Sequence, residues 1–190
     1  MVLGYLLGSV PFGLVITKLA GLGDIRAVGS GNIGATNVLR TGRKDLAAAT
    51  LLLDGGKGAM AVMAAWLLGW RPEIAGAAAF LGHCFPVWLG FKGGKGVATF
   101  LGTSLALWFP AGVLMCGVWL GSALVTRYSS LSALLAAAAG PLILFTMGKA
   151  SYALAALCMA TLILVRHRAN IDRLLKGAEP KIGKGKEGAA

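Results

Sequence analysis

The chain has 190 residues, of which 57% are hydrophobic and only 13% are charged, and its mean hydropathy is +0.77. Soluble domains carry about 25% charged residues, so the composition excludes an ordinary soluble fold and favours an all-α integral membrane protein. The net charge is +11. Because the cations lie between apolar runs and in the tail, they indicate cytoplasmic loops and anionic partners, and no nucleic acid is expected.

We expect residues 1–190 to form a single polytopic membrane domain, with 184–190 as a disordered basic tail. The apolar runs that predict spanning helices are 1–20, 46–70, 73–90, 97–126, 129–147 and 150–165. As one helix, 97–126 would measure about 45 Å, which exceeds a hydrocarbon core of about 30 Å. Pro110 lies in its middle, and proline breaks or kinks helices. Dividing the run there gives a bundle of about seven helices, two of them short.

The distribution of basic residues sets the expected orientation. The segment 21–45 and the tail after 165 are both rich in Lys and Arg, so both are expected in the cytoplasm. With about seven spans, the N-terminus then lies outside, and the loops 91–96 and 127–128 also face the cytoplasm. No basic stretch precedes the first apolar run, which predicts a spanning helix and not a cleaved signal peptide.

Small residues and cysteines in the apolar runs suggest packing only. Gly4 and Gly8, like Gly117 and Gly121, have the spacing that lets helices approach closely. The cysteines are expected to act as small buried hydrophobes, with no disulfide framework and no metal site; they are Cys84, Cys116 and Cys158.

The first polar loop reads Gly-Ser-Gly-Asn-Ile-Gly-Ala-Thr-Asn over 29–37. It matches the spacing G-x-G-x-x-G, but the dinucleotide fingerprint requires a preceding strand, which this context lacks. Backbone amides of such a segment, next to a helix start, suit a phosphate group. The residues expected to bind phosphate here are Gly29, Gly31, Asn32, Gly34, Thr36 and Asn37, with basic residues following from Arg40 onward.

Two charged residues interrupt the run 46–70. Asp54 and Lys57 are three positions apart, so they share a helix face and are able to pair with each other. Ionisable groups in spanning helices are either paired or functional. Two readings stay open: a structural ion pair, or a Lys57 that points into a polar site and is held there by Asp54.

The second polar loop, 91–99, contains Lys92, Gly93, Gly94 and Lys95. It is not a Walker A motif, because the required glycine position is occupied by Leu89. It is still a basic, glycine-rich turn before a helix, which suits an anion. His83 lies upstream in an apolar run, where a structural role is the more common one.

The third basic segment is 166–173. His167 and Asn170 are three residues apart, so on a helix they face the same way, and histidine is the usual acid–base group near neutral pH. His167 and Asp172 also have the spacing H-x-x-x-x-D, which is known from one class of acyltransferases but is short enough to occur by chance. The expected topology places all three segments at the cytoplasmic face, which predicts a site for a phosphorylated, water-soluble ligand next to lipid.

These segments resemble the bacterial acyl-phosphate:glycerol-3-phosphate acyltransferases, the PlsY family. The resemblance is carried by 29–40, 82–99 and 166–171, together with Glu179-Pro180-Lys181-Ile182-Gly183. It implies an enzyme of the bacterial cytoplasmic membrane, with its active site on the cytoplasmic face and no metal or other cofactor. The implied reaction moves a fatty acyl group from acyl phosphate to the 1-hydroxyl of glycerol 3-phosphate, and a soluble enzyme that makes acyl phosphate is a possible partner.

The resemblance also implies roles for individual residues. The residues that would serve the substrates are Ser30, Arg40, Lys92, Ser130, His167 and Asn170. Two departures affect local geometry: Gly55 and Gly56 stand where the family usually has a bulky pair, and the turn 40–44 is one residue shorter than in many members. Acyl phosphate carries a good leaving group, so we expect positioning and charge stabilisation without a covalent acyl-enzyme. His167 is either a general base or a phosphate ligand.

Three other functions account for these residues less well. A pure membrane scaffold explains the apolar spans but not three polar loops on one face. A CDP-alcohol phosphotransferase requires clustered aspartates for Mg²⁺, whereas the acidic residues here are scattered. A phosphate-ester transporter requires two structural repeats, and the only internal echo is Gly-Gly-Lys-Gly at 55–58 and 93–96.

Overall fold

The structure is a computed structural model that describes residues 1–183, and within this range it contains helices and no strands. The expected disordered tail at 184–190 lies outside the described residues. The helices in chain order are α1 (Val2–Gly8), α2 (Phe12–Leu19), η1 (Ile25–Ala27), α3 (Ala35–Leu39), α4 (Lys44–Leu67), α5 (Pro72–Cys84), η2 (Val87–Leu89), α6 (Val97–Leu107), α7 (Phe109–Thr126), α8 (Ser129–Thr146), α9 (Ala150–Arg166) and α10 (Arg168–Leu175).

The all-α membrane architecture is confirmed. Four segments are long and apolar enough to cross a bilayer: Val2–Leu19, Lys44–Leu67, Phe109–Thr126 and Ser129–Thr146. A fifth candidate is the pair α9 and α10, which is bent by 60°. Shorter helices such as α6 complete the bundle. The expected count of about seven spans and the orientation stay predictions.

Proline positions explain where the helices break. The run 97–126 is divided as expected, but at Trp108, two residues before Pro110. Pro110 then occupies the first turn of α7, where its missing N–H is harmless. The first run, 1–20, was expected to be continuous and is not: α1 ends before Pro11 and α2 begins after it, because proline removes a helical hydrogen bond.

Close helix contacts occur at some of the expected glycines. A side chain on Gly8 would overlap the carbonyl oxygen of Ala79, so Gly8 lets α1 approach α5. The packing role assigned to Gly117 and Gly121 is wrong, since no described atom lies within 4 Å of a side chain placed at either position. The main buried cluster is formed by residues of the five helices from α5 to α9, and it includes Phe80, Phe100, Met115, Leu144, Met159 and Ile163.

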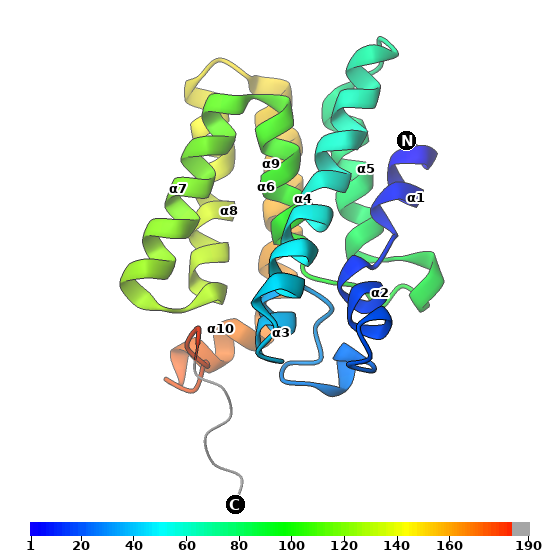
Figure 1. The fold of residues 1–190 in the computed structure, drawn as a ribbon. Helices are drawn as coiled ribbons and strands as arrows, with labels where there is room; N and C mark the ends of the chain where they lie inside the picture. Colours follow the sequence, from blue (N-terminus) through cyan, green and yellow to red (C-terminus); the bar gives the residue numbers. More distant parts are fainter. Residues whose placement is uncertain (184–190) are drawn as a thin grey trace, which may run out of the picture.

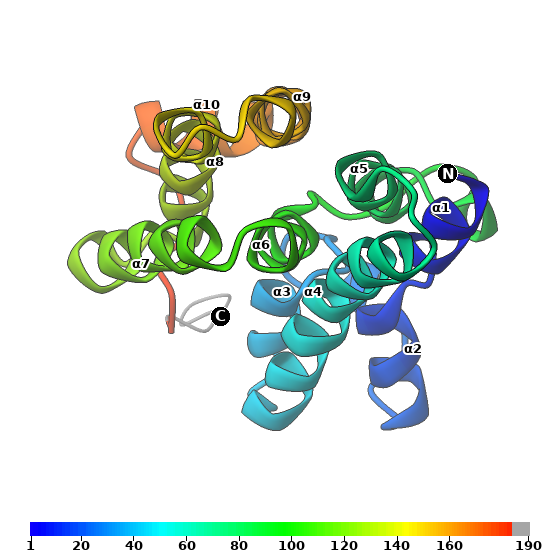
Figure 2. The ribbon, with the colours of Figure 1, turned by 90° about the horizontal axis from the view of Figure 1, so that it is seen from above.

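The polar segments gather at one end of the bundle. Figure 1 shows the loops before α4 and α6, the turn between α7 and α8, and helix α10 at the lower end, with the N-terminus at the opposite end. Seen from above, α6 stands between α4 and α7 (Figure 2), and it contacts both. The arrangement brings 21–43, 85–96 and 167–183 to the same end of the molecule, as the sequence predicted.

Candidate active site

A cavity of about 950 Å³ begins at this end and extends between the helices. Most of its polar lining comes from the loops and helix ends, and includes Ser30, Asn32, Thr36, Asn37, Arg40, Lys44, Lys95, Ser129, Ser130, His167, Asn170, Glu179 and Lys181. Asp54 of α4 and His83 of α5 also line the cavity. Its apolar lining comes from the interior turns of α4, α6 and α7, and includes Leu51, Leu52, Leu101, Leu105, Trp119 and Leu120. A ligand that fits the whole cavity has an anionic head and an apolar tail.

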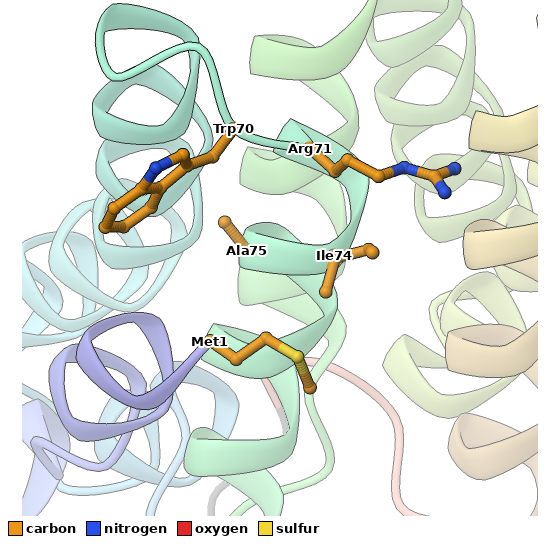
Figure 3. A pocket seen from close by; sticks show the side chains of 5 residues that line it. All are labelled: Met1, Trp70, Arg71, Ile74 and Ala75. Carbon is orange, nitrogen blue, oxygen red and sulfur yellow. The ribbon is translucent and has the colours of Figure 1, made fainter.

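A smaller hollow of about 440 Å³ lies at the other end, near the N-terminus (Figure 3). It is formed by Met1, Trp70, Arg71, Ile74 and Ala75, and the Arg71 guanidinium points away from Met1 and pairs with Glu73 at 2.6 Å. The charged groups that suit a phosphate line the larger cavity.

Asn37 organises the first loop. Its side-chain amide donates to the carbonyl oxygens of Ile25 and Val28 at 3.0 and 2.9 Å. Its carbonyl oxygen accepts hydrogen bonds from the Ser30 backbone at 3.0 Å and from the Arg40 guanidinium at 3.4 Å. Both donors of the amide are therefore occupied, and Asn37 holds Ser30 and Arg40 at the cavity wall.

Glycines allow the backbone of this loop to turn. Gly29 and Gly31 have positive φ values of 56° and 71°, a conformation that glycine adopts without strain. Neither lines the cavity, whereas Asn32, Gly34 and Thr36 do. The Thr36 hydroxyl also meets the Ser129 hydroxyl at 3.0 Å, which ties the loop to the start of α8.

Arg166 holds the second loop in place. It donates to the carbonyl oxygens of Gly93 and Gly94 at 2.6 and 3.2 Å. Gly94 packs against His83, where a larger side chain would overlap the imidazole. Of the residues expected to bind phosphate in this loop, only Lys95 lines the cavity; Lys92, Gly93 and Gly94 lie outside the lining.

Lys95 reaches across to the end of the bundle and donates to the Asn170 side-chain oxygen. Burial lowers the pKa of Lys95 to about 8, although the nearby Glu179 carboxylate acts in the opposite direction. Desolvation disfavours the charged form of an amine. Lys95 is therefore a cation at neutral pH that lies close to losing its charge.

His167 lies at the bend between α9 and α10 and is 3% exposed. Its Nδ1 is 2.8 Å from the Ile163 carbonyl oxygen, which is only able to accept. Nδ1 therefore carries the proton in the neutral ring, and Nε2 keeps a lone pair. Burial lowers the pKa of His167 to about 4, so the ring is neutral near pH 7.

Asn170 and Glu179 link the last two polar segments. The Asn170 amide donates to Glu179 at 2.6 Å, and the Arg173 guanidinium donates to the other carboxylate oxygen at 2.7 Å. Burial alone would raise the pKa of Glu179, but the hydrogen bonds from Asn170 and Arg173 hold the pKa below its usual value. The role of Glu179 was not predicted, because Arg173 and Asn170 are brought to it only by the fold of the chain after α10.

Residues 179–183 close one side of the cavity. The Ile182 backbone N–H donates to the Arg127 carbonyl oxygen at 2.7 Å. In return, the Arg127 guanidinium donates to the Ile182 carbonyl oxygen at 3.2 Å. Ser130, at the start of α8, lines the cavity beside this segment and is 6% exposed. Its hydroxyl makes no hydrogen bond of ordinary geometry within residues 1–183, so it is available to a ligand.

Lys57 lies away from the cavity lining. Its ammonium is 2.8 Å from Asp54 and 3.0 Å from the Val10 carbonyl oxygen, which the break at Pro11 leaves without a helical partner. Asp54 also lies 3.5 Å from His83. Of the two readings for this pair, the geometry favours the structural ion pair.

Comparison with known proteins identifies the family. A family model described as glycerol-3-phosphate acyltransferase matches residues 1–177. The glycerol-3-phosphate acyltransferase of Jannaschia sp. (strain CCS1) is 63% identical over 184 residues, which cover 96% of this chain and 91% of that protein. The one from Paramagnetospirillum magneticum is 64% identical over 182 residues, covering 95% of this chain and 90% of the relative.

Solved structures agree with the sequence comparison. The crystal structure of PlsY, an integral membrane glycerol 3-phosphate acyltransferase, in its glycerol 3-phosphate form has a TM-score of 0.90 and 44% identity, covering 96% of this chain and 93% of that one. The lysophosphatidic acid form has a TM-score of 0.86 and 43% identity, covering 95% and 92%. With nearly the whole chain matched in sequence and in fold, the protein belongs to the family of integral membrane glycerol-3-phosphate acyltransferases.

Proposed function

We propose that the protein transfers a fatty acyl group from acyl phosphate to the sn-1 hydroxyl of glycerol 3-phosphate, giving lysophosphatidate and inorganic phosphate. The observation that carries this proposal is the two-part lining of the cavity, cationic at one end and apolar along α4, α6 and α7. Acyl phosphate is an amphiphile that requires both parts. The PlsY structures in the glycerol 3-phosphate and lysophosphatidic acid forms support the acceptor and the product.

The cations of the polar end serve the two phosphate groups. Arg40, Lys44 and Lys95 line this end together with the hydroxyls of Ser30 and Ser130. Two phosphates side by side repel each other, and several cations in a partly desolvated site offset that repulsion. We assign Arg40 and Lys95 to phosphate binding, with Ser30 and Ser130 as hydrogen-bond donors.

The chemical step is a direct displacement at the acyl carbon. The glycerol hydroxyl oxygen forms a bond to the acyl carbon, and the bond from that carbon to the phosphate oxygen breaks. The electron pair of the broken bond leaves with inorganic phosphate, and the hydroxyl proton passes to a base. Because phosphate is a good leaving group, positioning and stabilisation of the developing oxyanion suffice, and no acyl-enzyme is formed.

His167 is suited to accept a proton. With Nδ1–H committed to the Ile163 carbonyl oxygen, Nε2 of the neutral ring accepts a hydrogen bond and is unable to donate one. That favours the general-base role over the phosphate-ligand role. Two bound phosphates raise the pKa of His167 above its value in the empty site, which makes the ring a better base when both substrates are present.

The reaction takes place on the cytoplasmic side of the bacterial inner membrane, where glycerol 3-phosphate is dissolved and the cationic loops lie. Acyl phosphate is supplied by a soluble enzyme that works next to the membrane, and its tail enters the apolar part of the cavity. No metal or other cofactor takes part.

The choice of acyl donor is the part of the proposal that needs its own test. Purified protein in detergent is given labelled glycerol 3-phosphate and either palmitoyl phosphate or palmitoyl-coenzyme A. We expect lysophosphatidate from palmitoyl phosphate only. Product from the thioester at an equal or higher rate would overturn the assignment of the donor and leave the acceptor assignment standing.

A further inference from the structure

Two adjacent glycines in the middle of α4 have different surroundings. A side chain on Gly55 would come within 3.3 Å of the Ala98 carbonyl oxygen, and a side chain on Gly102 would overlap the Gly55 backbone. The close approach of α4 and α6 therefore requires Gly102 and makes the space beside Gly55 tight. A side chain on Gly56 would meet no atom of the described chain within 4 Å, so packing does not account for this glycine.

Gly56 borders the cavity. On α4 it follows Leu52 by one turn and precedes Ala59 by nearly one turn, and all three line the cavity. The cavity is also lined by Leu105 of α6 and Trp119 of α7, and α6 stands between α4 and α7 (Figure 2). Gly56 is twelve residues beyond Lys44, or about 18 Å along the helix axis, and it lies beyond Asp54, the last charged residue of α4 that lines the cavity.

A buried hydroxyl at the polar end of the same cavity supports its assignment as a ligand site. The buried Ser130 hydroxyl faces the cavity without a hydrogen bond of ordinary geometry to residues 1–183. Glycine is the least favourable residue after proline in a helix interior. A glycine that no neighbouring helix requires, at the wall of a hollow, is explained by the room that it leaves.

We propose that Gly56 determines the length and bulk of the acyl chain that the enzyme accepts. The inference rests on the proposed function, since it takes the apolar part of the cavity to hold the acyl chain during transfer. A larger side chain at this position fills the hollow between α4 and α7 and shortens the chain that fits. One methylene too many in an apolar pocket costs about 10- to 200-fold in kcat/KM.

The experiment compares Gly56→Ala, Gly56→Leu and Gly56→Phe with the wild type, using octanoyl, lauroyl and palmitoyl phosphate as donors. We expect kcat/KM for palmitoyl phosphate to fall by about tenfold or more in Gly56→Leu, with octanoyl phosphate nearly unaffected. Gly56→Phe should shift the preference further, and Gly56→Ala should shift it least. The measured quantity is the ratio of kcat/KM between two donors. A loss of folded enzyme lowers both values equally and leaves this ratio unchanged.

Gly117→Leu is the matched control, because Gly117 also has open space around it but does not line the cavity. Its donor ratio should equal that of the wild type. An unchanged ratio in all three Gly56 variants, with the wild type active, would overturn the inference. A wild type that transfers no acyl group from any acyl phosphate would instead overturn the proposed function.

Discussion

The chemistry assigned to the cavity depends on the two ring nitrogens of His167. Nδ1 is held by the Ile163 carbonyl oxygen, one turn back on α9, and the ring is nearly fully buried. This contact selects the tautomer with a free lone pair on Nε2. The same residue would be a poor phosphate ligand in this form, because it has no N–H to offer.

Replacement of His167 by Ala should lower kcat by about 10²- to 10⁴-fold, the usual contribution of a general base. The KM for glycerol 3-phosphate should change little, since the neutral ring contributes no charge to phosphate binding. Steady-state kinetics with palmitoyl phosphate as the donor measures both constants. A large increase in KM with an unchanged kcat would show that His167 binds phosphate.

The lowered pKa of Lys95 leads us to expect a loss of activity at alkaline pH. Its pKa is lowered to about 8, so the ammonium is charged below that pH and becomes neutral as the pH rises through it. Substrate phosphates keep their charge over this range, because their second pKa is about 6. We expect kcat/KM to fall above pH 8 by about ten- to a hundredfold in total, as for the loss of one hydrogen bond to a charged group.

The variant Lys95→Arg tests the cause of this pH dependence. Arginine stays protonated throughout the range, so the decline above pH 8 should disappear even if the activity at pH 7 is lower. A decline that persists unchanged in Lys95→Arg would assign the titration to another group.

Part of the cavity lining could be predicted from the sequence. Ser30, Arg40, Lys95, His167 and Asn170 belong to long motifs and line the cavity. Glu179 and Trp119 were missed, because their neighbours in space are remote in sequence and neither interrupts a local pattern. A place for Lys57 in the substrate site was one of two readings from the sequence, yet its ammonium pairs with Asp54 and the Val10 carbonyl oxygen. The Val10 partner arises from a helix break, which the sequence reading did not include.

At the level of the helices, a break in one helix provides a contact to another. Pro11 interrupts the first helix, and the freed Val10 carbonyl oxygen is bound by Lys57 from α4. The breaks at Pro11 and near Pro110 arise from one cause, the missing proline N–H, but only the second was predicted. The first run is short enough to span the membrane as one helix, so its length gave no reason to divide it.

Removal of one charge from the α4 pair should destabilise the protein. Lys57→Met leaves Asp54 buried without its cation, and breaking a buried pair costs about 3–5 kcal/mol. The double variant Asp54→Asn/Lys57→Met removes both charges and should recover much of that loss. Thermal unfolding in detergent measures the stability of each variant. The KM for glycerol 3-phosphate should be unchanged in the folded variants. A raised KM would show that Lys57 belongs to the substrate site.

At the level of the whole molecule, the N-terminus and helix α10 lie at opposite ends, and the cationic segments share the end at which α10 lies (Figure 1). Lipid surrounds the apolar helices, so this end faces water on one side of the membrane. The predicted orientation places it in the cytoplasm, because Lys and Arg are retained there. The anionic substrate and the membrane-bound tail then meet at a single boundary.

Cysteine labelling in cells tests the orientation. In a variant without the native cysteines, Asp45→Cys at the start of α4 should be protected from a membrane-impermeant maleimide until the membrane is opened. Leu68→Cys at the other end of α4, a position that is 56% exposed, should react in intact spheroplasts. The reverse pattern would place the candidate site outside the cytoplasm.

Direct transfer between two substrates in one cavity is tested most directly with palmitoyl phosphate labelled in its acyl group. Purified protein is incubated with this donor and EDTA, with and without glycerol 3-phosphate, and the label is followed after denaturation. The account predicts that the label moves to lysophosphatidate only when glycerol 3-phosphate is present, and that the protein itself stays unlabelled. Label bound covalently to the protein in the absence of glycerol 3-phosphate, or a folded enzyme that forms no lysophosphatidate, would contradict it.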